Sequence, residues 1–364
     1  MKNKKNLILA VTCILVASIA MIFLYNSNEK KTSDTIKTKD GQVKIVANKV
    51  DSLSLEDYKS DVFTMKKPKG WNVISGGAGI YYAIKVYDPN DSNNGLFLML
   101  KMQPLLKSNA AKKSWQQYYK LAGGQYSLFA NAVVLDNPTT EGFYKKFNEI
   151  GKYMNNVEPT LSNFAFPVYK NFTKKDEQAS TASMKNVAMD SKVLRATFDG
   201  ENNKKGEGMF LASIVNFGNQ YSGGADLSYY MVYDIMSITS NESEFIDYKD
   251  ILLKSINSIE FSDAYVKKTI DDGNAQTKQA LQLNAQIQKA FDSYMSAWEN
   301  RSKTYDIISQ KQSDAILGYE RVYNSDTGEI YKAYNGFTDD YKGELYKSVT
   351  DDMYTVKTSG YIEK

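Results

Sequence analysis

The sequence predicts an α+β fold: an N-terminal transmembrane helix, an antiparallel sheet with flanking helices, and then a long amphipathic helix and a tyrosine-rich β-hairpin. Three observations lead to this prediction. An unbroken apolar run opens the chain. Residues 80–87 and 96–103 are rich in Ile, Val, Tyr, Phe and Leu, and turn formers separate them, as in a β-hairpin. Apolar residues three and four positions apart, as in residues 140–153, indicate helices that pack on such a sheet.

The apolar run predicts a membrane segment. Residues 7–25 contain no charged side chain and follow Lys2, Lys4 and Lys5. As a helix, these nineteen residues would extend for roughly 28 Å, close to the thickness of the hydrocarbon core of a bilayer. Lysines ahead of the segment favour a cytoplasmic N-terminus. We therefore expect residues 1–25 to form a signal-anchor helix in the cell membrane, with the rest of the chain on the extracytoplasmic side.

Two other interpretations of this run stay open. Ser18, Ile19 and Ala20 match the small-residue pattern of a signal-peptide cleavage site, which would give a secreted protein. Cys13 is the residue that a lipoprotein signal would acylate. The apolar run continues beyond Ala20, however, whereas a cleaved signal peptide usually turns polar there. The uncleaved anchor is therefore the preferred interpretation.

Composition divides the remainder of the chain into three parts. Residues 26–52 are polar and rich in lysine, so we expect a stalk. Residues 53–264 hold the alternating strand and helix signals of the α+β domain. Near residue 265 the apolar pattern changes to the period of one long helix, which marks a C-terminal module over residues 265–364.

A short motif at the start of the α+β domain carries a family resemblance. Residues 62–71 are Val-Phe-Thr-Met-Lys-Lys-Pro-Lys-Gly-Trp, a strand that ends in a Pro-x-Gly-Trp turn. This motif is similar to the start of PsbP-like domains and of DcrB-type exported bacterial proteins. The resemblance covers residues 53–262 and implies an exported α+β domain with an accessory role and no catalytic residues. The C-terminal tail resembles that of uncharacterised exported bacterial proteins. This second resemblance does not point to any activity.

The C-terminal module contains the candidate binding residues. Residues 271–317 place apolar side chains three and four positions apart, as on one face of a long helix. Residues 318–323 and 329–334 alternate aromatic and polar residues around an Asn-Ser-Asp-Thr-Gly turn, which predicts a β-hairpin. Tyrosines on a hairpin mostly pack on the sheet, but they also form protein interfaces or stack on sugar rings. The candidate binding residues are Trp298, Tyr319, Tyr323, Tyr331 and Tyr334.

Missing residue types exclude several classes of chemistry. The chain has no histidine, and its one cysteine, Cys13, lies in the apolar run. Nucleophile systems that depend on Ser–His or Cys–His pairs are therefore excluded, as are zinc, iron and copper sites built from His or Cys. The net charge of +3 is small and spread along the chain, so we expect no nucleic-acid partner. We also expect no cofactor.

Acidic loops leave one alternative for a hard cation. Residues 88–95 are rich in oxygen ligands, but the loop lacks the glycine and glutamate positions of an EF-hand. Residues 339–340 and 351–352 are Asp-Asp pairs that each follow a threonine. Such pairs are more typical of helix caps and turns. We therefore expect no metal site.

Taken together, these observations predict a non-catalytic, membrane-anchored extracytoplasmic protein. Its expected partner is an envelope or membrane protein, bound through the long helix and the tyrosine hairpin. A cell-wall or glycan-binding domain is an alternative, since tyrosine also contacts sugars. A hydrolase that uses two carboxylates is a second alternative, because it needs neither histidine nor cysteine.

Overall fold

The computed structural model describes residues 43–47, 53–201, 203–217, 221–222, 224–271 and 303–363. Within these ranges no helix is long and apolar enough to cross a membrane. The structure therefore corrects the predicted fold class: the described fold is α+β with antiparallel sheets, without the transmembrane helix. Its helices are short, α10 having 15 residues, whereas crossing a bilayer takes about 20 apolar ones. The residues on which that helix was predicted, 7–25, lie outside the described ranges.

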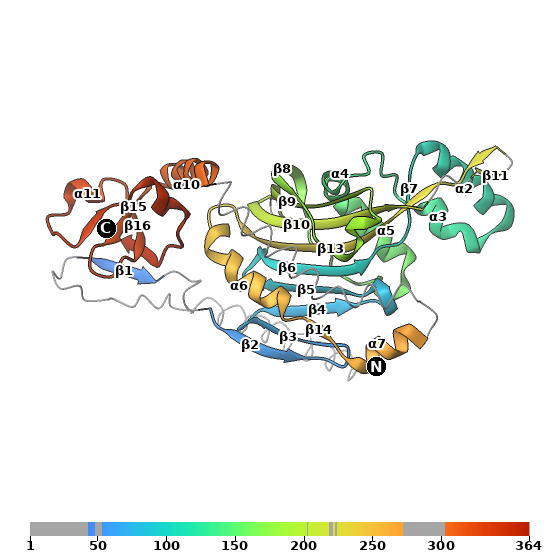
Figure 1. Cartoon of the computed structure of the whole chain (residues 1–364), viewed down its shortest axis with the longest axis horizontal. Coiled ribbons are helices and arrows are strands. Elements are labelled where there is room, and N and C mark those ends of the chain that lie inside the picture. The colour runs from blue at the N-terminus through green and yellow to red at the C-terminus, as the bar shows by residue number, and fades with distance from the viewer. Residues whose placement is uncertain are drawn as a thin grey trace, which may run out of the picture.

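An eight-stranded antiparallel sheet forms the larger part of the molecule (Figure 1). Its strand order is β4-β5-β6-β13-β10-β9-β8, and β7 pairs with β13 beside this path. Long neighbouring strands form its centre. Apolar residues follow one another along these strands with few interruptions. This pattern arises because other helices and strands pack on both faces of the sheet. The strands are β4 (Asn72–Gly76), β5 (Ala83–Asp88), β6 (Asp91–Lys101), β7 (Leu105–Leu106), β8 (Lys170–Ala179), β9 (Asp190–Asp199), β10 (Lys205–Asn216) and β13 (Tyr229–Asn241).

The hairpin predicted from residues 80–87 and 96–103 is present in this sheet, and a second hairpin follows along the chain. β5 pairs with β6, and β9 pairs with β10, each pair antiparallel. The loop predicted over residues 88–95 is shorter than expected, because β6 begins at Asp91. The Asn93 side chain explains the longer strand: it is buried and donates hydrogen bonds of 3.1 and 3.3 Å to the carbonyl oxygens of Lys204 and Lys205 in the next hairpin.

One face of the large sheet packs on an amphipathic helix and a small sheet. Leu98 and Met236 share a core with Phe245 and Leu252 of α6 and with Phe63 of β3. Helix α7 follows this small sheet in the chain. The elements on this side are η1 (Gly79–Tyr81), α6 (Phe245–Asn257), α7 (Asp263–Asp271) and a three-stranded sheet of β2 (Leu55–Lys59), β3 (Phe63–Pro68) and β14 (Glu260–Phe261), with η4 (Ser183–Asn186) beside them.

The other face packs on the helices between β7 and β8. Phe97 and Phe210 of the sheet share a core with Trp115, Phe143 and Phe147. The helix predicted over residues 140–153 is two helices, which meet at Lys146. The elements on this side are α2 (Asn109–Ala122), η2 (Gly124–Tyr126), α3 (Ser127–Asn131), α4 (Thr140–Lys145), α5 (Phe147–Val157) and η3 (Pro159–Leu161), and a small hairpin of β11 (Tyr221–Ser222) and β12 (Ala225–Asp226) lies beside α2.

The C-terminal residues form a second, five-stranded sheet at one end of the molecule (Figure 1). The predicted hairpin, β15 paired with β16, is its centre. Its edge strand β1 comes from the segment that we assigned to the stalk, and β1 pairs antiparallel with β18. The elements are β1 (Lys44–Ala47), α10 (Lys303–Leu317), β15 (Tyr319–Asn324), β16 (Ile330–Tyr334), α11 (Phe337–Asp340), β17 (Tyr346–Ser348), η5 (Asp351–Thr355) and β18 (Gly360–Glu363).

Candidate functional site

Helix α10 connects the two sheets, and its buried side is polar. Asp306, Gln310 and Asp314 are all buried, and their four-residue spacing places them on one side of the helix. Ile308, Ile316 and Leu317 are 50%, 84% and 51% exposed. This arrangement is the reverse of an ordinary amphipathic helix, in which the apolar stripe faces the core.

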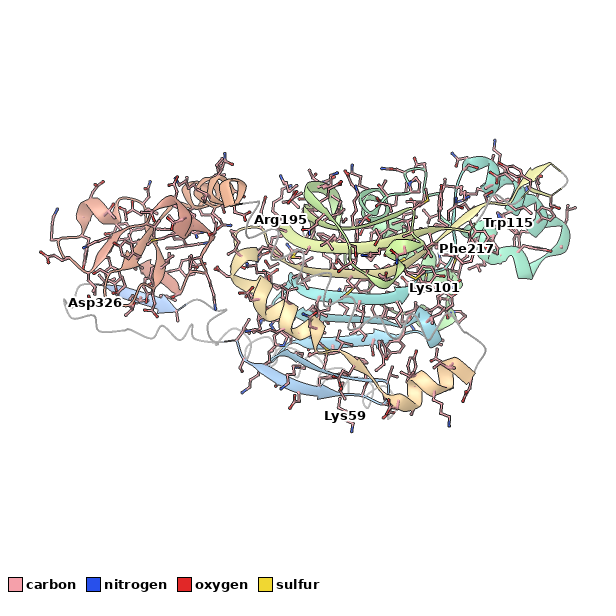
Figure 2. All side chains as sticks on the ribbon, in the orientation of Figure 1. Lys59, Lys101, Trp115, Arg195, Phe217 and Asp326 are labelled. Atoms are coloured by element: carbon pink, nitrogen blue, oxygen red, sulfur yellow. The ribbon has the colours of Figure 1, made fainter. Side chains whose placement is uncertain are left out.

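The first anchor of α10 is a buried arginine of the large sheet. Arg195 on β9 pairs through Nε with Glu207 of β10 and through Nη1 with Asp306 of α10. Its guanidinium also lies 5.8 Å from the ring centroid of Phe245. Figure 2 labels Arg195 at the end of the large sheet nearest α10. One guanidinium thus holds two carboxylates, one from the sheet and one from the helix.

The buried surroundings of Asp306 shift the pKa of its carboxyl group. Burial disfavours the ionised carboxylate and raises the pKa of Asp306 to about 6, with a further contribution from the negative charge of Glu207. The positive charges of Arg195 and Lys249 act in the opposite direction and do not offset the effect of burial. With this pKa, Asp306 takes up a proton at mildly acidic pH, where a carboxyl with an ordinary pKa stays ionised.

The second anchor is a buried arginine of the C-terminal sheet. Arg321 on β15 donates from Nε to Oδ2 of Asp314 at 2.5 Å and from Nη2 to the side chain of Gln310. Its Nη1 donates to the carbonyl oxygen of Tyr354 at 3.1 Å. Lys332 on β16 lies 3.5 Å from Oδ1 of Asp314. The rigid fork of a guanidinium suits such a shared, buried site better than a lysine does.

Further hydrogen bonds join the C-terminal residues to the first turn of α6 and to the turn before it. Lys332 donates to the carbonyl oxygen of Ser243 at 3.3 Å. The backbone N–H of Thr358 donates to Oδ1 of Asp247 at 3.0 Å, and its hydroxyl lies 3.2 Å from Oδ2 of the same carboxylate. These bonds join the C-terminal residues to the larger part of the molecule directly, in addition to the two arginine anchors that hold α10 from either side.

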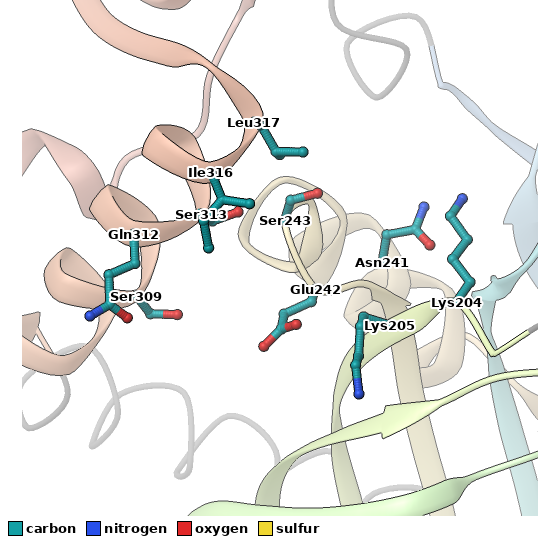
Figure 3. A pocket seen from close by; sticks show the side chains of 10 residues that line it. All are labelled: Lys204, Lys205, Asn241, Glu242, Ser243, Ser309, Gln312, Ser313, Ile316 and Leu317. Carbon is teal, nitrogen blue, oxygen red and sulfur yellow. The ribbon is translucent and has the colours of Figure 1, made fainter.

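A pocket of about 470 Å³ opens between α10 and the large sheet (Figure 3). The side chains of Ile316 and Leu317 belong to its α10 wall, and Lys204 and Lys205 belong to the opposite wall. Glu242 is the acidic residue of the lining, and burial raises its pKa. The lining residues are Lys204, Lys205, Asn241, Glu242, Ser243, Ser309, Gln312, Ser313, Ile316 and Leu317.

The tyrosines predicted as binding residues lie elsewhere. Tyr331 is buried, its ring lies 5.9 Å from that of Tyr346, and its hydroxyl donates to Glu329 at 2.8 Å. Tyr334 is half-buried and meets the ring of Phe337 edge-on at 5.6 Å. These two side chains pack within the core of the C-terminal sheet.

The other predicted residues do not join them in one site. Tyr319 and Tyr323 are half-buried on β15, and Tyr319 lies 5.5 Å from the ring of Tyr361. Trp298 lies outside the described residues. In the described part of the chain no group of three or more acidic residues or cysteines is placed to hold a metal ion.

Sequence reasoning missed the charged anchors of α10. A signal was available, because the chain has 45 basic residues and its arginines are Arg195, Arg301 and Arg321. Two of these arginines, Arg195 and Arg321, hold the buried anchors, a role that a guanidinium fills better than an ammonium group does. Neither a comparison with family models nor one with curated proteins found a match to this chain. The resemblance to PsbP-like and DcrB-type domains thus stays a prediction.

Proposed function

We propose that this chain is a non-catalytic binding protein that recognises a segment of another protein on the outward face of α10. The observation that supports this most is the reversed polarity of that helix. Ile316 is 84% exposed although Asp306 and Asp314 on the same helix are buried. Leaving apolar side chains in water while burying charged ones is costly for folding alone, but it is useful for recognition.

The two walls of the pocket define the chemistry of the partner segment. The wall of Ile316 and Leu317 accepts apolar side chains. The opposite wall carries Lys204 and Lys205, whose side chains stay more than half exposed although they pair with Asp91 and Asp199. A partner segment with one or two apolar residues beside an acidic residue complements both walls. A pocket of about 470 Å³ has room for such side chains.

The two alternative functions gain less support from the same geometry. A glycoside hydrolase of the usual kind needs two carboxylates on either side of the scissile bond, and the pocket lining contributes Glu242. A glycan site needs open aromatic faces, whereas Tyr331 and Tyr334 pack in the core of the C-terminal sheet. Binding of a protein segment is therefore the function that these contacts favour.

Point variants of α10 test this proposal in the full chain. We expect Ile316→Ser with Leu317→Ser to abolish photo-crosslinking of a discrete protein partner to a probe at Gln312, which lines the same pocket. Deleting residues 265–364 would be a poorer test, because β1 would lose its partner β18.

The matched control is Val187→Ser with Met189→Ser, since both side chains are also exposed and apolar but lie near η4. This control should crosslink like the unmodified chain. Equal crosslinking by both double variants would contradict the proposal. Retention of the unmodified chain on purified cell-wall glycan, with no protein crosslink, would favour the glycan alternative instead.

A further inference from the structure

The end of the molecule opposite the C-terminal sheet is a projecting tip built from α2, η2, α3 and the β11–β12 hairpin (Figure 1). Its sequence is unusual in charge. Residues 105–135 contain four lysines and no acidic residue, and the β11–β12 hairpin over residues 221–226 contains one charged residue, Asp226. The tip is therefore a local basic region in a chain whose charges otherwise nearly balance.

Three of these lysines lie on α2. Lys113 and Lys120 are exposed and Lys112 is half-buried. Within the described residues none of the three forms an ion pair or a side-chain hydrogen bond, so their charges are not neutralised locally. The fourth, Lys107, is different: it donates to Asn216 at 2.6 Å at the base of the tip. The unneutralised positive charge thus belongs to the outer side of α2.

Apolar and aromatic side chains are also exposed on this tip. Leu121, next to Lys120 in the last turn of α2, is 85% exposed. Tyr221 on the adjacent hairpin is 69% exposed, and Tyr119 is 42% exposed. Exposed Leu and Tyr beside lysine are the combination found on protein surfaces that enter the headgroup region of a bilayer.

A series of aromatic contacts joins the tip to the large sheet. Trp115 stacks on Phe129 of α3 with ring centroids 4.3 Å apart, and Phe129 in turn contacts Tyr229 of β13 at 5.3 Å. Tyr229 stacks on Phe217 at the base of the hairpin. Figure 2 places Trp115 at this end of the molecule. These contacts reach from the tip into the large sheet, so α2 packs on the main body of the molecule through Trp115.

We propose that this tip is a docking surface for the anionic face of a lipid bilayer. Lys112, Lys113 and Lys120 supply attraction to acidic headgroups. Leu121 and Tyr221 supply shallow apolar insertion, which an acidic protein or a polyanion would not need. The surface is separate from the pocket beside α10, so it is independent of the protein-binding function proposed above.

A local fluorescent probe on the full chain tests this proposal. We label Leu121→Cys in a Cys13→Ser background with an environment-sensitive dye and add phosphatidylcholine vesicles with or without phosphatidylglycerol. The expected result is a blue-shifted emission on the vesicles that contain phosphatidylglycerol. A probe at Asp326→Cys, in the turn at the opposite end of the molecule (Figure 2), should not respond. Because the readout is local, lipid binding by another part of the chain does not mimic it.

Charge variants identify the residues responsible. The triple variant Lys112→Gln, Lys113→Gln and Lys120→Gln should bind vesicles that contain phosphatidylglycerol with an affinity lower on the order of a hundredfold. Each lysine near a membrane surface contributes about fivefold to that affinity. The matched control replaces three exposed lysines elsewhere, Lys254, Lys268 and Lys347, and should leave the response unchanged. An equal shift on neutral and anionic vesicles, no shift on either, or equal loss in both triple variants would overturn the proposal.

Discussion

Helices α6 and α10 have similar lengths and each lies on a sheet, yet they are held in opposite ways. Helix α6 buries Phe245, Tyr248 and Leu252 against the large sheet. Helix α10 buries Asp306 and Asp314. The first contact is non-directional, because burial of apolar area depends little on orientation. The second depends on guanidinium geometry, which fixes one position of the helix.

The two helices therefore contribute differently to the free energy of folding and to the position of their exposed faces. Apolar packing of α6 contributes to the free energy of folding in proportion to the area that it removes from water. Buried ion pairs contribute less, because desolvation offsets most of their Coulomb attraction. The charged anchors of α10 therefore serve mainly to hold one face of the helix outward, where Ile316 and Leu317 are exposed.

Removing one member of the first anchor should have the largest effect on stability. Arg195→Met leaves the carboxylates of Glu207 and Asp306 buried without their guanidinium. We expect the free energy of unfolding to fall by about 3–5 kcal/mol, measured by urea denaturation.

Two further variants sharpen this comparison. Leu252→Ala in α6 should cost about 2–5 kcal/mol through the cavity that it leaves. Replacing the whole anchor, as Arg195→Met with Glu207→Leu and Asp306→Leu, should be neutral or stabilising, because no charge is then left unpaired. A loss in the triple variant as large as in Arg195→Met would mean that the ion pairs themselves stabilise the fold.

A smaller effect should appear in how the free energy of unfolding depends on pH. The pKa of Asp306 is about 6 in the folded chain, against 3.8 without burial. The folded state therefore binds this proton more tightly than the unfolded state does. The resulting stabilisation is complete below about pH 4 and is lost as the pH rises through 6, so that it amounts to about 1 kcal/mol between pH 7 and pH 5.

The comparison with Asp306→Asn isolates this contribution from the other carboxylates. The unmodified chain should gain about 1 kcal/mol more than the variant when the pH is lowered from 7 to 5, measured by urea denaturation at each pH. Arg195, Glu207 and Lys249 face Asp306 and are the same in both proteins. Identical pH profiles would show that Asp306 keeps an ordinary pKa.

Local patterns were sufficient to predict the hairpins but not the polarity of α10. Alternating residues and a turn predicted the β15–β16 pair, because both signals are contained in a few consecutive residues. In α10 the spacing that includes Ile308 predicted a buried apolar stripe, whereas the structure buries the polar side of the helix, with Asp306 and Asp314. Burial of this polar side depends in part on a partner far away in the chain, since Arg195 and Asp306 are 111 residues apart. Arg321, the partner of Asp314, is only 7 residues away, but the pairing forms only when β15 folds back against α10.

The edge strand β1 was difficult to predict for the same reason. Its four residues lie in a polar, lysine-rich segment, and their partner β18 is at the other end of the chain. The pairing of Lys44 with Glu363 spans 319 positions. The site between α10 and the large sheet likewise combines residues from 204 to 317, and no local motif marks it.

The smallest effect on stability should come from substitutions on the outward face of α10. A substitution on the buried face of α6 provides the comparison. Ile316→Ser with Leu317→Ser removes apolar side chains that are already in water, so we expect the free energy of unfolding to change by no more than about 0.5 kcal/mol. Ile256→Ser in α6, whose side chain is buried, should cost several times more. Urea denaturation of the two proteins distinguishes a face kept free for a partner from a face that packs within the chain. A large loss on changing Ile316 and Leu317 would mean that the fold itself uses this surface.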